Sequence, residues 1–136
     1  MSFTMYEATE RHGANINAYF ASLMARYFKT GEISPLVDRS DMNEEDIDLL
    51  LEFSRYLAFH RGERVAIDFC EKLHHHILDH ESLQICVGRV LMLQAELFNQ
   101  IGKSMSRDLY AVEAAEAFLM FDLVPAAEKA LAMVRA

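Results

Sequence analysis

Apolar residues recur along most of the chain every three or four positions, the spacing of one face of an α-helix. The first such segment runs from about Met5 to Lys29. Its apolar stripe consists of Ile16, Phe20, Leu23, Met24 and Tyr27. Thr30-Gly31-Glu32 ends this segment, and Ser34-Pro35 begins a short new element. The pattern therefore predicts an N-terminal amphipathic helix within residues 1–31.

The rest of the chain predicts five further helices, over about 44–60, 65–78, 81–101, 107–121 and 125–134. The polar stretch before the first of these offers Asn43 or Asp41 as its N-cap. Tight breaks at Gly62, at Gly102 and between Asp122 and Pro125 separate neighbouring segments. Helices joined by such short turns must lie antiparallel. We therefore predict an all-α fold of about six helices in one domain spanning residues 1–136.

The two hairpins with the tightest turns share a pattern of small residues. Ser54 and Ala66 lie on the two helices of the first hairpin, and Ala114 and Ala126 on those of the last. Small side chains let two helix axes approach closely, as in tetratricopeptide-like stacks of helix pairs. Residues 44–136 therefore predict stacked antiparallel pairs of this kind. A generic helical bundle would carry similar stripes, and the usual tryptophan of the motif is absent.

Charge and hydropathy narrow the function classes. The net charge is −8 and 52% of the residues are hydrophobic, which favours a folded, acidic protein and argues against nucleic-acid binding. No segment approaches the roughly 18 apolar residues of a membrane span. The first ten residues lack the apolar run of a signal peptide, and two cysteines within apolar segments suit a reducing compartment. We expect a cytoplasmic protein without stable membrane insertion.

Residues that could carry chemistry gather only around His74-His75-His76, with Glu71 and His80 nearby. Glu71 and His75 lie one helical turn apart, as do His76 and His80, so either pair could share a metal ion. Consecutive histidines point 100° apart, however, so the three cannot converge on one ion. Motifs for a nucleophile or a phosphate-binding loop are absent from the sequence. We predict a protein that is not an enzyme, with no cofactor and no metal site.

Several short motifs appear in an order that resembles a known family. They are Tyr56-Leu57-Ala58-Phe59 with Gly62, Ala66 and Phe69, then Leu78-Asp79-His80 with Gly88 and Gln94-Ala95, then Ala114-Ala115-Glu116 with Ala127-Glu128. In this order they resemble the class II chaperones of type III secretion, small acidic proteins that hold translocator subunits in the bacterial cytoplasm. The resemblance covers Glu44–Arg135. The stretch from Gln100 to Tyr110 is too short for a complete middle repeat, so we expect its second helix to be truncated or fused to the next.

The resemblance implies a cytoplasmic chaperone that binds a secreted client protein on the concave side of its helix pairs. By position, the client-binding groove would be lined by Leu51, Arg55, Ala58, Leu91, Gln94, Ala111, Ala115 and Phe118. It also implies a homodimer formed through the N-terminal stripe listed above. Methionines such as Met24, Met92 and Met120 suit adaptable contacts with variable apolar side chains. A regulatory adaptor that sequesters a transcription or secretion regulator would use the same scaffold, and the sequence leaves both readings open.

Overall fold

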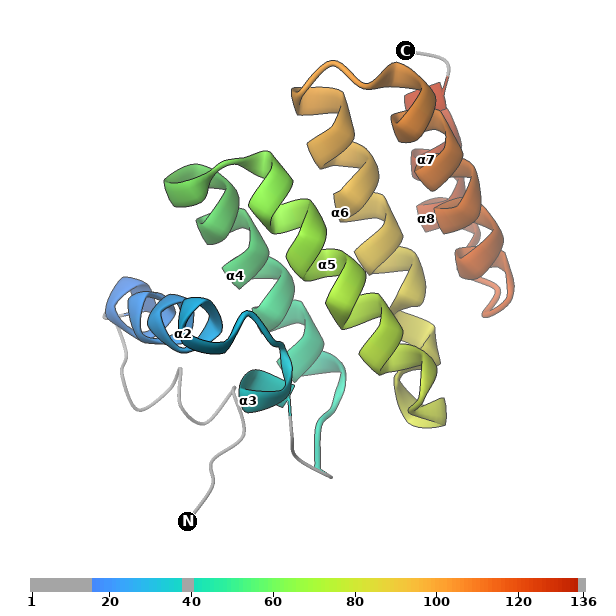
Figure 1. Ribbon diagram of the computed structural model, residues 1–136. Coiled ribbons are helices and arrows are strands. Elements are labelled where there is room, and N and C mark those ends of the chain that lie inside the picture. Colours follow the sequence, from blue (N-terminus) through green and yellow to red (C-terminus); the bar gives the residue numbers. More distant parts are fainter. Residues whose placement is uncertain (1–15, 38–40, 135–136) are drawn as a thin grey trace.

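The computed structural model describes residues 16–37 and 41–134 and is all-helical within them. Its elements in chain order are α2 (Ile16–Thr30), α3 (Ser34–Val37), α4 (Glu44–Arg61), α5 (Glu63–Leu78), the 3-10 helix η1 (Glu81–Cys86), α6 (Val87–Gln100), α7 (Ser104–Leu119) and α8 (Val124–Val134). Helices α4 to α8 stand side by side, each antiparallel to the one before, and α2 lies across one end of the stack (Figure 1). The predicted all-α fold of stacked antiparallel helix pairs is confirmed.

The first hairpin, α4 and α5, has the caps that its sequence predicts. Asn43 accepts a hydrogen bond from the backbone N–H of Asp46 at 3.1 Å, and the Asp46 carboxylate accepts one from the Asn43 N–H at 3.0 Å. This reciprocal capping box fixes the start of α4. At its other end Gly62 has φ 98°, a conformation that side chains disfavour, and one residue is enough to turn the chain into α5.

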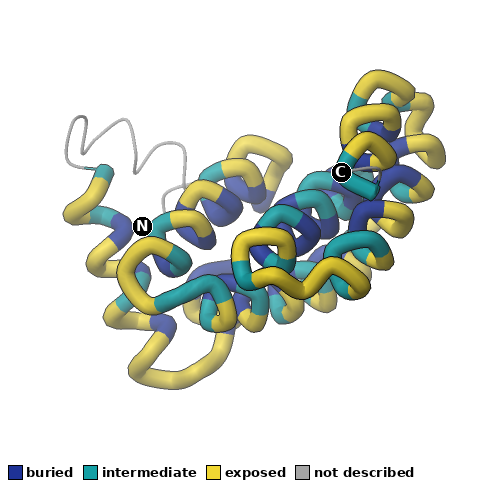
Figure 2. Tube along the Cα trace, turned by 90° about the horizontal axis from the view of Figure 1, so that it is seen from above, coloured by how far each residue is buried: buried dark blue, intermediate teal, exposed yellow. Residues whose placement is uncertain are grey.

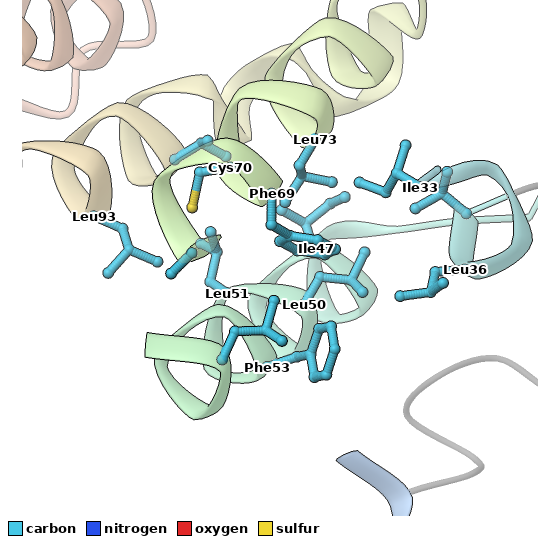
Figure 3. Packing of buried hydrophobic residues seen from close by; sticks show 14 of the residues in the cluster. Ile33, Leu36, Ile47, Leu50, Leu51, Phe53, Phe69, Cys70, Leu73 and Leu93 are labelled. Carbon is cyan, nitrogen blue, oxygen red and sulfur yellow. The ribbon is translucent and has the colours of Figure 1, made fainter. Parts of the chain in front are cut away.

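Buried side chains form two clusters that meet at α6. The larger cluster joins α2, α3, α4, α5, η1 and one side of α6, with Phe53 and Phe69 fully buried at its centre (Figure 3). The smaller cluster joins Leu91 on α6 to the alanines of α7 and α8. Buried residues lie where neighbouring helices face one another and the outer faces are exposed (Figure 2). Because each helix packs mainly on its neighbours in the sequence, the protein is built as a stack.

Helix α2 buries its apolar stripe within its own chain. Phe20 packs against Phe53 with ring centroids 5.8 Å apart, and Tyr27 meets Phe69 edge-on at 5.2 Å. Leu23 is buried beside them, while Ile16 and Met24 are partly buried against the same core. The five residues expected at a dimer interface therefore face the protein's own core. An amphipathic helix can cover its stripe on the nearest apolar surface, and here α4 and α5 offer one.

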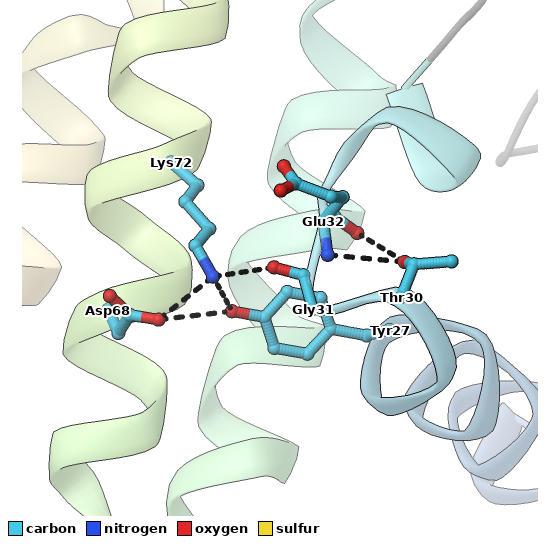
Figure 4. Close-up of polar contacts among 6 residues, drawn as sticks. All are labelled: Tyr27, Thr30, Gly31, Glu32, Asp68 and Lys72. Carbon is cyan, nitrogen blue, oxygen red and sulfur yellow. Dashed lines mark hydrogen bonds and ion pairs between the residues drawn. The ribbon is translucent and has the colours of Figure 1, made fainter.

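Polar contacts fasten the end of α2 to α5 (Figure 4). Lys72 donates to the carbonyl oxygen of Gly31 at 2.7 Å and to the Tyr27 hydroxyl at 3.0 Å, and its ammonium lies 3.0 Å from Asp68. The Tyr27 hydroxyl donates to Asp68 at 3.3 Å. The positive charge of Lys72 lies at the C-terminal end of α2, where it also interacts favourably with the helix dipole.

One expectation for the second half needs correction. The helix expected over 81–101 is divided, since η1 ends at Cys86 and α6 begins at Val87. Of the two alternatives expected for the middle pair, truncation is wrong, because α7 begins at Ser104 and runs for 16 residues against α6, and the structure agrees with a helix shared with the next pair. The other side of α7 packs on α8, so one helix serves two pairs. The stretch from Gln100 to Tyr110 is short for that reason. The part of the first predicted helix before Ile16 lies outside the described residues.

Candidate functional site

A pocket of about 450 Å³ lies between α4 and α6, and Phe118 of α7 bounds it at one end. This size falls within the roughly 300–1,000 Å³ of ordinary ligand sites. Its lining residues are Glu45, Asp48, Leu49, Leu51, Glu52, Arg55, Arg89, Met92, Leu93, Glu96 and Phe118. The pocket therefore lies between the first helices of the two neighbouring pairs.

The floor of the pocket is apolar. Leu51 and Leu93 reach toward each other from α4 and α6 (Figure 3), and the half-buried Met92 lies beside them. Phe118 comes from α7, with only 6% of its side chain exposed. A side chain at Gly88 would place its Cβ 2.6 Å from two carbons of the Phe118 ring, so only glycine leaves room for the ring there. Phe118 thus closes the pocket by lying on the backbone of α6.

Two arginines hold the rim by bridging α4 and α6. The Arg89 guanidinium is 2.7 Å from Glu44 and 2.9 Å from Asp48, and Arg55 is 3.1 Å from Glu96. These pairs are partly exposed, so each adds little to stability, on the order of 0–1 kcal/mol. They connect α4 to α6 at the rim of the pocket.

Two further hollows lie along α4 next to this pocket. Arg55 also lines one with Ala58, Glu63, Leu97 and Gln100, and another with Phe20 and Tyr56. Both of these hollows include Phe59, whose side chain is 85% exposed. The exposed face of α4 therefore forms a discontinuous groove on either side of Arg55.

The predicted groove residues divide into two sets in the structure. Leu51, Arg55 and Phe118 line the main pocket and Ala58 lines a neighbouring hollow. The other four are buried between helices and offer a client almost no surface: Leu91, Gln94, Ala111 and Ala115. Their placement in an open groove is wrong, because α7 packs directly on that side of α6 and covers it. Sequence reasoning also missed Leu49, Leu93 and Arg89, which line the pocket only because α4 and α6 are paired.

Gln94 differs from its buried neighbours because it is polar. Its side chain is fully buried, and neither its amide nitrogen nor its amide oxygen has a hydrogen-bond partner among the described residues. An unsatisfied buried amide costs about 1–3 kcal/mol. By contrast, the amide of Gln84 donates to the carbonyl oxygens of Ile77 and Leu78 and so joins η1 to the end of α5.

The histidine cluster extends from the last turns of α5 to His80, which precedes η1. His75 lies 3.7 Å from Glu71, while the ring nitrogen of His80 lies 3.0 Å from the carbonyl oxygen of His76. Within residues 16–37 and 41–134, no three histidine, cysteine or acidic side chains come together as a metal site would require. Burial lowers the pKa of His74, as does the neighbouring His75. The cluster thus has no shared focus for one ion.

Both cysteines are free thiols within the core. Burial raises the pKa of Cys70 to about 12, although a hydrogen bond from its sulfur to the Ser54 hydroxyl at 3.5 Å acts in the opposite direction. Burial also raises the pKa of Cys86 to about 11. A thiol is nucleophilic only as its thiolate, so neither cysteine has the character of a reactive one.

Comparison of the chain with protein-family models, with curated proteins and with solved structures finds no match. Among the helices in the described part of the chain, none combines the length and the apolar character needed to cross a membrane.

Proposed function

We propose that this protein is a chaperone-like binding protein that holds an apolar segment of another protein in the pocket between α4 and α6. The observation that carries the proposal is the apolar lining of this pocket, where the partly exposed Leu49 and Met92 lie with the buried side chains of Leu51, Leu93 and Phe118. A preformed surface of this kind costs little ordering when it binds a short segment of a partner. Met92 adds an adaptable contact at its centre.

The motif order described above favours a specific form of this function. We propose that the partner is a secreted client of a type III secretion system and that binding takes place in the bacterial cytoplasm. The negative net charge supports a protein that stays soluble while it offers apolar surface to a client. A homodimer remains part of the proposal, but α2 would have to leave its place on α4 and α5, or another surface would have to form the interface.

A pair of matched variants tests the pocket. Met92→Glu places a charge on the floor, whereas Met105→Glu makes the same change on α7 at a side chain that is 87% exposed. Tagged wild-type protein and both variants are used to capture partners from the native cytoplasm, and circular dichroism checks that each variant is folded. We expect the partner to be lost with Met92→Glu and kept with Met105→Glu. Loss with Met105→Glu alone would move the binding surface to the outer face of α7.

A regulatory adaptor that sequesters a transcription or secretion regulator would use the same pocket. The identity of the captured partner, established by mass spectrometry, separates the two functions. A secreted protein carried by the pocket supports the chaperone, and a regulator in its place supports the adaptor.

A further inference from the structure

The charges around the pocket are unbalanced in a way that bears on what it binds. Four carboxylates line it, those of Glu45, Asp48, Glu52 and Glu96, against the two guanidinium groups of Arg55 and Arg89. Both arginines are already committed to carboxylates, at 3.1 Å for Arg55 and at 2.7 and 2.9 Å for Arg89. The rim therefore has no spare positive charge for an acidic partner.

The spare negative charge lies on one side of the pocket, along α4. Glu45 is exposed and makes no ion pair with any described residue. The carboxylate of Glu52 is 3.8 Å from Arg55, which is nearer to Glu96. Seven positions separate these two glutamates, so they lie about 10 Å apart along the same face of the helix. They form two acidic points next to one apolar floor.

We infer that the pocket selects a partner segment in which a large apolar side chain lies within a few positions of lysine or arginine. This inference rests on the proposed function and specifies the class of segment that it binds. The apolar side chain contacts Leu51, Met92 and Phe118, and the basic side chains reach Glu45 and Glu52. An extended segment advances about 3.3 Å per residue and its side chains alternate between two faces, so two basic residues two or four positions apart would lie on the face that meets both glutamates.

Charge adds selectivity here more than binding strength. Each exposed ion pair contributes little, so removal of both glutamates should weaken the affinity for a basic segment by roughly two- to thirtyfold. The same removal should leave the affinity for a neutral segment with the same apolar residue almost unchanged. An acidic segment would instead meet like charges at the rim, which disfavours the wrong partner.

A displayed library of random twelve-residue peptides, selected on the full chain, tests this inference. The selection is repeated on Glu45→Gln/Glu52→Gln and on Glu113→Gln/Glu116→Gln. The second pair makes the same charge change on α7 at exposed residues outside the pocket. We expect wild type and the α7 variant to enrich peptides with lysine or arginine near an apolar residue. Selection on Glu45→Gln/Glu52→Gln should enrich peptides that have the apolar residue but no lysine or arginine near it.

The outcomes separate this inference from the proposed function. Peptides that bind wild type but not Met92→Glu would show that the pocket is the binding site. The charge selection would still be overturned if these peptides lack basic residues, or if selection on Glu45→Gln/Glu52→Gln enriches the same basic residues. If Met92→Glu, folded by circular dichroism, binds every enriched peptide as wild type does, the pocket is not the binding site. Both proposals would then fall.

Discussion

The ring of Phe118 on α7 lies directly on the backbone of Gly88 on α6. A Cβ built at Gly88 would be 2.6 Å from the Cδ1 and Cε1 atoms of that ring and 2.9 Å from Cγ. Glycine in a helix costs about 1 kcal/mol relative to alanine, so Gly88 lowers the intrinsic stability of α6. The absence of a side chain lets α7 pack closely on α6, and Phe118 thereby reaches the end of the pocket.

Gly88→Ala should therefore destabilise the protein despite the better helix propensity of alanine. Overpacking costs about 1–3 kcal/mol, against the gain of about 1 kcal/mol from alanine, so we expect a net loss of up to about 2 kcal/mol. Urea denaturation measures the change. The displaced ring should also narrow the pocket and weaken binding there.

Phe118→Leu tests whether the clash with the Phe118 ring causes the loss of stability in Gly88→Ala. If the clash with the ring is responsible, Gly88→Ala should cost less in the Phe118→Leu background, with a coupling of about 0.5–3 kcal/mol. Strict additivity of the two substitutions would show that Gly88 is required for another reason.

The fold was largely predictable from the sequence, but the groove was only partly so. Helical periodicity, Asn43 and Gly62 are local signals, and they placed α4 and α5 to within about two residues of their ends. Gln94 and Ala115 are different, because their exposure depends on where α7 packs. Periodicity shows that a helix has an apolar face without showing which neighbour covers it. The shared use of α7 by two pairs is likewise a property of the assembled stack.

Gln94→Met should stabilise the protein. The amide has no partner among the described residues, and an unbranched apolar side chain of similar length removes the cost of burying it. We expect a gain of about 1–3 kcal/mol, seen as a rise in Tm by scanning calorimetry. Gln84→Met is the matched control and should lower Tm, because it removes hydrogen bonds of 3.1 and 3.0 Å to the end of α5. An unchanged or lower Tm for Gln94→Met would contradict the assignment of an unsatisfied amide.

Tyr27→Phe should loosen α2. The substitution keeps the ring contact with Phe69 but removes the hydroxyl that Lys72 and Asp68 share. The expected loss is about 0.5–1.5 kcal/mol, and amide hydrogen exchange should become faster in α2 ahead of α5. Tyr56→Phe should stay within about 0.5 kcal/mol of wild type, because no contact of its hydroxyl is found among the described residues. Equal effects of the two substitutions would show that the polar contacts to Lys72 do not hold α2.

Stability should fall as the pH rises above about 9, in part because of Cys70. The folded protein raises the pKa of this thiol to about 12, so between the unfolded and the folded pKa the unfolded chain has lost the proton that the folded chain keeps. Deprotonation then favours unfolding. The contribution of Cys70 to stability is complete below the unfolded pKa and declines above it.

We therefore expect the free energy of unfolding, measured in urea between pH 8 and about 11, to decline less steeply in Cys70→Ala than in wild type. The substitution also costs stability at every pH because it empties part of the core, so the comparison is between slopes. Because burial raises the pKa of Cys86 less, to about 11, Cys86→Ala should flatten the slope between about pH 9 and 11, whereas the effect of Cys70 continues to higher pH. Parallel slopes for wild type and Cys70→Ala would mean that the Cys70 thiol ionises equally in both states, as it would if water reached it in the folded protein.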